Sequence, residues 1–167
     1  VLTLNGLRDN VLLRADGGIK IGRDVVIAAL LGADEFGIGT MSLVAMGCIM
    51  VRQCHSNTCP VGVCTQDDAL RKKFTGTPEK VVNLFSFIAE EVREILAFLG
   101  FRTLDEIIGR TDLLTQVRRG NPHLDDLDLN PLLVQADPGG INRSETRGMR
   151  NEVPDSLDAQ MIKDAAP

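Results

Sequence analysis

Apolar and polar positions near the N-terminus predict two short strands separated by a helix. The apolar runs 11–15 and 35–38 are short and end at glycines, which is typical of buried strands. Between them, the apolar run 24–31 predicts a helix with Asp24 as its N-cap and Gly32 as its C-terminal stop. A strand, a helix and a strand within ~30 residues form a βαβ unit. The pattern therefore predicts an α/β fold with parallel strands.

The middle of the chain is predicted to consist of two helices separated by a loop. An apolar helix is expected from Leu43 to about Arg52, followed by a loop over 53–76 that contains Asn, Pro and Gly. Apolar positions at helical spacing then predict a long helix over 78–99. Thr77 is its expected N-cap, and Gly100 is expected to end it.

The C-terminal part has weaker signals. Thr103 and Glu106 fit the capping-box pattern and predict a short helix through Ile108. Residues 121–167 carry Asn, Asp, Pro and Gly at short intervals, so we expect an extended connector with one amphipathic turn near 156–163.

Composition narrows the classes of function. The chain has 167 residues, of which 44% are hydrophobic, so it has enough apolar content for a folded core. A net charge of −5 argues against binding to nucleic acids or anionic membranes, and no apolar run reaches the length of a membrane span. We therefore expect a cytoplasmic protein. Because the first residue is Val1 and not Met, we also expect a piece of a longer protein.

Glycines follow both predicted strands and indicate a phosphate site. Asp16, Gly17 and Gly18 follow the first strand, and Gly39 and Thr40 follow the second. Glycines at the carboxyl ends of neighbouring parallel strands let backbone N–H groups approach an anion, and the last two strands of a β/α barrel are a common phosphate site. The alternative is that these glycines only make tight turns.

Four cysteines lie within seventeen residues and indicate a metal or cluster site: Cys48, Cys54, Cys59 and Cys64. A structural disulfide set or inert thiols are the alternatives, although the dense clustering and the expected cytoplasmic location disfavour disulfides. The gaps are wider than the close pairs of zinc sites and suit a larger iron–sulfur cluster. His55 is a ligand or, more in keeping with its place beside a cysteine, an outer-shell group. Cys64 is a fourth ligand or a small buried apolar residue.

These motifs together resemble the large subunit of glutamate synthase. The resemblance runs through 15–18, 22–29, 32–37 and 46–50, and is most specific in the block Cys-His-Ser-Asn-Thr-Cys-Pro-Val-Gly-Val over 54–63. It implies the C-terminal part of an FMN-binding (β/α)8 barrel, its last two β/α units, over 1–52. A cluster loop over 53–76, a helical segment over 77–120 and a connector toward a β-helix domain over 121–167 would follow.

The resemblance also implies the cofactors and their residues. Three cysteines match the ligands of a 3Fe–4S cluster, namely Cys48, Cys54 and Cys59. The two loops that hold the FMN phosphate would contain Asp16, Gly17, Gly18, Gly39 and Thr40.

The family's reaction would combine 2-oxoglutarate with ammonia derived from glutamine. The resulting 2-iminoglutarate takes a hydride from reduced flavin and becomes L-glutamate. Electrons would reach FMN through the cluster, either from NAD(P)H through an FAD-containing small subunit or from ferredoxin. No catalytic residue is assigned in this chain, and alone it is expected to be inactive. The competing interpretations are another FMN-barrel oxidoreductase and a non-catalytic interaction module stapled by zinc or a cluster.

Overall fold

The computed structural model describes residues 2–5, 7–135 and 157–165, and the chain divides into two units. The smaller unit comprises 1–11 and 136–167 and contains two 3₁₀ turns, Thr3–Asn5 and Arg8–Asn10, and helix α6, Leu157–Asp164. Helix α6 confirms the amphipathic turn predicted near 156–163. The connector predicted over 136–156 lies outside the described residues. The larger unit, 12–135, holds the remaining elements.

The predicted βαβ unit is present in the larger unit. Strands β1, Arg14–Asp16, and β2, Glu35–Gly37, pair in parallel, with Arg14 opposite Glu35 and Asp16 opposite Gly37. The first strand starts later than predicted, at Arg14, and just before it the carbonyl oxygen of Leu13 accepts from the N–H groups of both Asp34 and Glu35. The α/β character is thus confirmed with two three-residue strands.

Helix α1, Gly22–Leu30, joins the two strands, and its first turn differs from the prediction. Asp24 is not the N-cap but lies at the third helical position. Its carboxylate reaches back and accepts from the N–H groups of Lys20 and Ile21, at 3.0 and 3.3 Å. At the other end Gly32, with φ +110°, donates to Ala29 O, so the predicted stop is confirmed.

Helix α2, Gly39–Ala45, corrects the prediction of a helix over 43–52. It begins at Gly39, so Gly39 and Thr40 form its first turn and do not lie in a loop. It ends early because Gly47 adopts φ +100° and Cys48 N–H donates to Leu43 O at 3.0 Å. This 6→1 bond and the left-handed glycine are the features of a Schellman C-cap.

The segment between α2 and the long helix is a loop, as predicted, with two short helical turns. These are the 3₁₀ turn Cys54–Ser56 and helix α3, Asp68–Arg71. Asp67 caps α3, since its carboxylate accepts from Leu70 N–H at 2.9 Å.

Helix α4, Pro78–Leu99, has the predicted bounds, and Gly100 ends it with φ +84°. The short helix predicted through Ile108 is only a 3₁₀ turn, Asp105–Ile107, beside which Thr103 Oγ1 donates to Glu106 Oε1 at 3.0 Å. Three further short elements follow: a 3₁₀ turn at Thr111–Leu113, helix α5, Pro122–Asp125, and a 3₁₀ turn at Asn130–Leu132.

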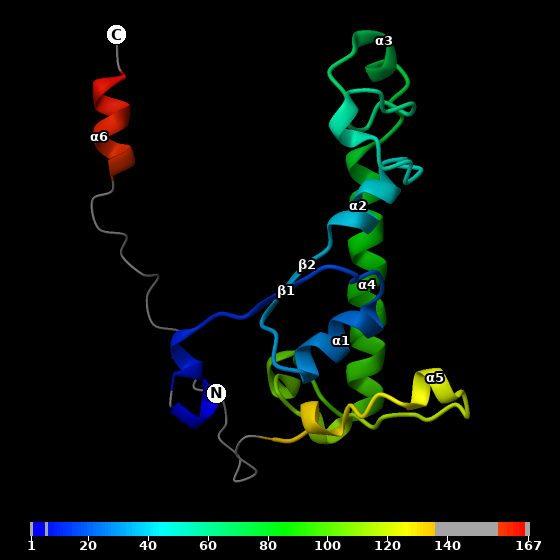
Figure 1. Cartoon of the computed structure of the whole chain (residues 1–167), viewed down its shortest axis with the longest axis vertical. Helices are drawn as coiled ribbons and strands as arrows, with labels where there is room; N and C mark the ends of the chain where they lie inside the picture. The colour runs from blue at the N-terminus through cyan, green and yellow to red at the C-terminus, as the bar shows by residue number, and fades with distance from the viewer. Residues whose placement is uncertain (1, 6, 136–156, 166–167) are drawn as a thin grey trace. The chain divides into compact units, whose positions relative to one another are not determined.

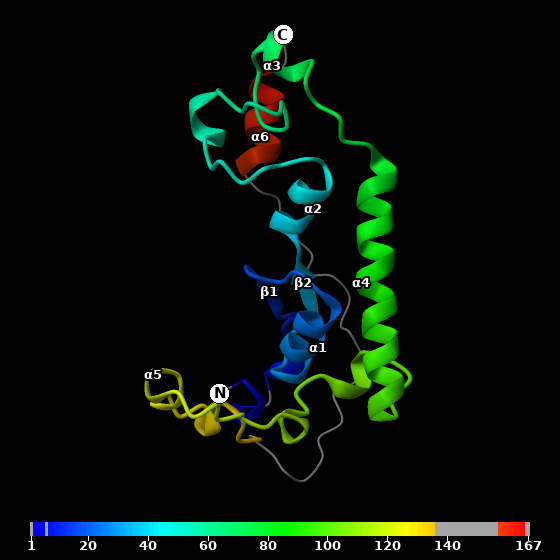
Figure 2. The same ribbon diagram turned by 90° about the vertical axis from the view of Figure 1, so that its right-hand side faces the viewer.

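Helix α4 is the element on which the larger unit packs. Helices α1 and α2 both contact it, and the cysteine loop lies toward the end at which α4 begins (Figures 1 and 2). The core clusters contain buried apolar side chains from the segment before α1, from α1, from α4 and from the turn after α4: Ile19, Val25, Val26, Ala29, Leu30, Ile88, Leu96 and Ile107. Burial of these side chains supplies the main stabilisation of the unit.

The contact between α1 and α4 is closest at Gly22. A Cβ at this position would lie 2.8 Å from both Ile88 O and Val92 N of α4, so only glycine fits there without displacing backbone. Glu91 of α4 completes the contact, because its carboxylate accepts from Gly22 N–H at 2.6 Å and Arg23 N–H at 3.3 Å. A side chain of one helix thereby caps the N-terminus of the other.

Several large apolar side chains remain exposed, among them Leu12, Phe87 and Phe98, which is 90% exposed. Within the described part of the chain, no helix has the length and apolar character needed to span a membrane.

The cap made by Glu91 can be tested by unfolding in urea. Glu91→Ala removes both acceptors from the start of α1, and we expect the free energy of unfolding to fall by about 1–2 kcal/mol. The control is Glu94→Ala on the exposed part of α4, which should change it by less than about 0.5 kcal/mol. Gly22→Ala should lower the free energy of unfolding by about 1–3 kcal/mol, because the added methyl group overpacks the contact with α4. Equal effects of the two Glu substitutions would contradict the cap.

Candidate functional site

The carboxyl ends of β1 and β2 lie side by side, so the two predicted phosphate loops start at one edge of the sheet. Gly17 and Gly18 adopt φ of +93° and +78°, a conformation that favours glycine. The Asp16 carboxylate accepts from Gly17 N–H at 2.6 Å and lies against Gly37, where a Cβ would be 2.7 Å from Asp16 Cγ. Asp16 therefore packs the carboxyl end of β1 against that of β2.

Open space lies beside the glycines that follow both strands. A Cβ built on Gly17, Gly18 or Gly39 would meet no atom within 4 Å. Gly39 and Thr40 are the first two residues of α2, where backbone N–H groups lack partners within the helix. The edge therefore offers free backbone surface of the kind that a phosphate group needs.

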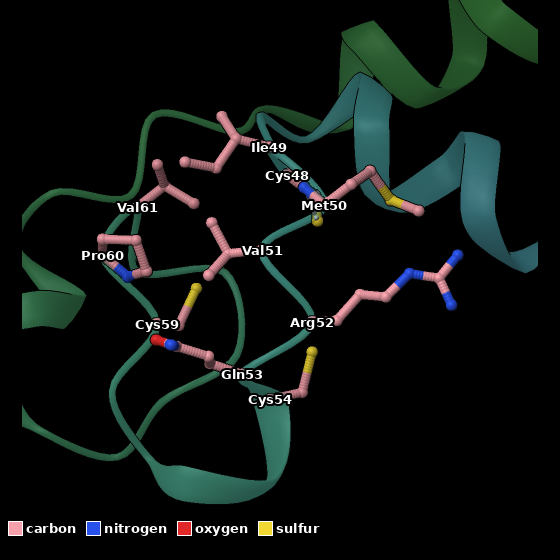
Figure 3. Close-up of a pocket in the computed structure, with 10 residues that line it drawn as sticks. All are labelled: Cys48, Ile49, Met50, Val51, Arg52, Gln53, Cys54, Cys59, Pro60 and Val61. Atoms are coloured by element: carbon pink, nitrogen blue, oxygen red, sulfur yellow. Dashed lines mark hydrogen bonds between the residues drawn. The ribbon is translucent and has the colours of Figure 1, made fainter.

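Three of the four cysteines line one pocket. Cys48 enters it directly after α2, and Cys54 and Cys59 enter from the loop that follows (Figure 3). The side chains of Cys54 and Cys59 extend from that loop toward the segment of Val51 and Arg52 (Figure 3). The other lining residues are Ile49, Met50, Val51, Arg52, Gln53, Pro60 and Val61. The structure thus brings the three sequence-predicted ligands together.

The segment after Cys48 has an unusual backbone. Met50 and Arg52 both adopt φ +60°, which residues with side chains visit at a cost. In this conformation Met50 N–H donates to Cys48 Sγ at 3.4 Å. The strained segment therefore directs a backbone dipole at one of the three sulfurs.

The backbone of the turn after Cys59 affects the charge state of its thiol. The pKa of this thiol is lowered, because N–H groups of Cys64 and then Val61 donate to its sulfur, with smaller contributions from Val63 and Gly62. Gly62, with φ +75°, makes this turn possible, and it lies too close to Leu70 O to accept a Cβ. The thiolate form of Cys59 is consequently favoured.

Cys64 lies beside the pocket but does not line it. The pKa of its thiol is raised, chiefly by the negative charge of Cys54 and also by burial and a hydrogen bond with the Cys54 side chain. His55 is exposed in the turn Cys54–Ser56 and also lies outside the pocket lining.

Thiolate sulfurs with N–H donors around them are the ligands that iron–sulfur clusters use, so the donor set fits such a group. Across the described residues, no three His, Cys, Asp or Glu side chains are gathered as they would be around a single metal ion. A cluster places its thiolates on different irons, which separates the sulfurs more widely than one ion does.

The sequence analysis missed the pocket residues between Cys48 and Cys54, because it placed them in a helix. Gly47, directly before the first cysteine, was the available signal, because glycine commonly ends a helix. The backbone donors to Cys59 had no comparable signal apart from Gly62.

Comparison with known proteins adds an independent observation. Residues 1–102 match the family model described as the conserved region in glutamate synthase. The chain is 74% identical over 167 residues to the glutamate synthase [NADPH] large chain of Azospirillum brasilense, covering all of this chain and 11% of that protein. It is 53% identical over 163 residues to the corresponding large chain of Bacillus subtilis, covering 96% of this chain and 10% of that protein.

A ferredoxin-dependent relative is similar over a shorter range. The chain is 65% identical over 114 residues to ferredoxin-dependent glutamate synthase 2 of Synechocystis, covering 68% of this chain and 7% of that protein. The chain thus spans about a tenth of the length of these relatives. A family match over more than half of the chain and high identity along all of it establish that the chain belongs to the glutamate synthase family.

Proposed function

We propose that this chain holds the 3Fe–4S cluster and one side of the FMN phosphate in a glutamate synthase, which forms L-glutamate from 2-oxoglutarate and ammonia derived from glutamine. The observation that carries the proposal is the pocket lined by Cys48, Cys54 and Cys59. Its support is the 74% identity to a glutamate synthase large chain.

In this proposal the parallel strands β1 and β2 are the last two strands of a (β/α)8 barrel. Residues 1–52 then end the barrel, 53–76 form the cluster loop, 77–120 pack on the barrel and 121–167 lead to the next domain. The parallel register supports this assignment, since barrel strands are parallel and bind ligands at their carboxyl ends.

The three pocket cysteines would be the cluster ligands, and the group they hold supplies one-electron transfer. The chain's own part is to keep the sulfurs as thiolates, which the N–H groups of Met50 and of residues 61–64 support. Hydrogen bonds to ligand sulfurs also set the reduction potential of such a group.

The glycines at the sheet edge would hold the phosphate of FMN, and the flavin supplies hydride transfer when bound. Gly17, Gly18 and Gly39 leave room for it, and Thr40 adds a hydroxyl in the first turn of α2. Asp16 would act indirectly, because its carboxylate is engaged with Gly17 N–H.

The electron donor in this proposal is NAD(P)H, acting through an FAD-containing small subunit, or ferredoxin. Relatives of both kinds carry this region, one named for NADPH and one for ferredoxin.

The cluster is tested by anaerobic reconstitution of the full-length large chain that carries this sequence. We expect about three irons and acid-labile sulfide per chain, with an EPR signal in the oxidised state. Cys54→Ser should abolish the cluster, whereas the matched control Cys64→Ser should retain it. Stoichiometric zinc without sulfide would instead support a zinc-stapled interaction module.

The phosphate site is tested at Gly39 in the same full-length protein. Because a Cβ there meets no atom within 4 Å, Gly39→Leu should leave the fold intact and obstruct only an approaching ligand. We expect FMN binding to weaken about tenfold or more, equivalent to ~1.4 kcal/mol, and Gly39→Ala to have a smaller effect. Unchanged flavin content in the Leu variant would contradict the site.

The N–H donors to Cys59 predict an order of alkylation in the cluster-free protein. At pH 7 the lowered pKa gives Cys59 more thiolate than Cys64, so iodoacetamide should modify Cys59 first. With rising pH, the Cys59 rate should level off earlier than the Cys64 rate. Mass spectrometry of the tryptic peptide 53–71, which contains both residues, measures this order. Exposure alone predicts the reverse, since Cys64 is the more exposed residue.

A further inference from the structure

Asn57 lies between two of the three proposed cluster ligands and has an unusual backbone conformation. It follows Cys54 by three residues and precedes Cys59 by two. Its backbone adopts φ +60° and ψ +19° directly after the turn Cys54–Ser56. Among residues with side chains, asparagine and aspartate tolerate this left-handed conformation best. The chain therefore changes direction between the two cysteines at a residue type suited to it.

The side chain of Asn57 also binds the segment that follows Cys64. Its Oδ1 accepts from Gln66 N–H at 2.6 Å. Thr65 Oγ1 donates to Asn57 O at 2.8 Å and lies 3.0 Å from Asn57 Oδ1. Asparagine thus supplies both the left-handed backbone and the side-chain acceptor, whereas glycine would supply only the backbone.

The segment that Asn57 binds is itself fixed to helix α3. Thr65 Oγ1 accepts from Asp67 N–H at 3.1 Å. The Asp67 carboxylate in turn caps α3 by accepting from Leu70 N–H at 2.9 Å. These hydrogen bonds run from Asn57 through Thr65 and Asp67 to the helix. Asn57 is therefore attached to a small structured element.

Helix α3 also contacts the cysteine loop after Cys59. Gly62 follows Cys59 by three residues, and a Cβ on it would collide with Leu70 O. Gly62 N–H donates to Cys59 O at 3.2 Å, which closes the turn. The span that carries Cys59 is consequently anchored at both ends to one segment, 65–70. Asn57 provides the anchor before the cysteine, and Gly62 provides the anchor after it.

We propose that Asn57 is a positioning residue for the iron–sulfur cluster, because its side-chain acceptor fixes where the sulfur of Cys59 lies relative to that of Cys54. This inference rests on the proposed function of the pocket. Asn57 acts through the segment 65–70 and not by contact with the cluster, since it is exposed and does not line the pocket. A loop that is held in place beforehand lowers the cost of ordering both cysteines when a cluster binds.

Four substitutions separate the side-chain acceptor from the backbone conformation. Asn57→Gly removes the acceptor but accepts the left-handed backbone, whereas Asn57→Asp keeps both. Thr65→Val removes the hydroxyl that joins Asn57 to Asp67, and Thr65→Ser keeps it. The Gly and Val variants should therefore share one defect, which the Asp and Ser variants should lack.

Hydrogen exchange in the cluster-free, full-length large chain that carries this sequence tests the loop contact itself. Gln66 N–H should exchange about three- to tenfold faster in Asn57→Gly than in the unsubstituted protein, because its acceptor is lost. Asn57→Asp should restore the slower rate. Exchange within α4 should be the same in all variants, which shows that the fold is intact. Unchanged exchange at Gln66 in the Gly variant would overturn the inference.

The cluster supplies the second measurement, after anaerobic reconstitution of the same variants. A chelator should remove iron from Asn57→Gly and Thr65→Val about tenfold faster than from the unsubstituted protein, and their EPR signal should be broader. Asn57→Asp and Thr65→Ser should restore both properties. Faster exchange at Gln66 with unaltered iron release and EPR signal would overturn the positioning role. If the unsubstituted protein takes up no iron, the proposed cluster fails, whereas exchange at Gln66 still establishes or overturns the loop contact.

Discussion

The close contact of α1 with α4 at Gly22 is the constraint on which the larger unit depends. No side chain fits between the two backbones there, and the Glu91 carboxylate of α4 satisfies the first N–H groups of α1. Both strands are attached to α1, so this contact also positions the sheet edge with its glycines. Helix α2 packs on the same α4. One long helix thereby supports both the candidate phosphate loops and the helix that leads to the cysteines.

The sequence predicted those elements whose ends are determined locally. Helix α4 has the expected bounds because Pro78 and Gly100 act within its own terminal turns. The start of α1 was mistaken because its cap is not local: Glu91 lies 69 residues further along the chain. The end of α2 was mistaken because the apolar residues after Cys48 continued a helical pattern. They line the pocket instead of extending the helix.

The sequence indicated which side chains belong to the candidate site, but not the backbone groups around them. Cysteine spacing and family resemblance identified Cys48, Cys54 and Cys59, and the structure places all three around one pocket. The N–H donors could not be predicted, because the donor to Cys48 depends on left-handed backbone at Met50 and those to Cys59 depend on the turn at Gly62. What distinguishes Cys59 from Cys64 is therefore the conformation of the loop and not the residue type.

Helix α2 fixes the relation between the two candidate sites. It begins with Gly39 at the sheet edge, and the left-handed Gly47 that ends it comes directly before Cys48. Seven helical residues advance the chain by about 10 Å, so the phosphate loop and the first cysteine are separated by a short, rigid spacer. Each added residue would rotate Cys48 by roughly 100° about the helix axis. The position of Gly47 therefore determines which way the first cysteine faces as well as where the helix ends.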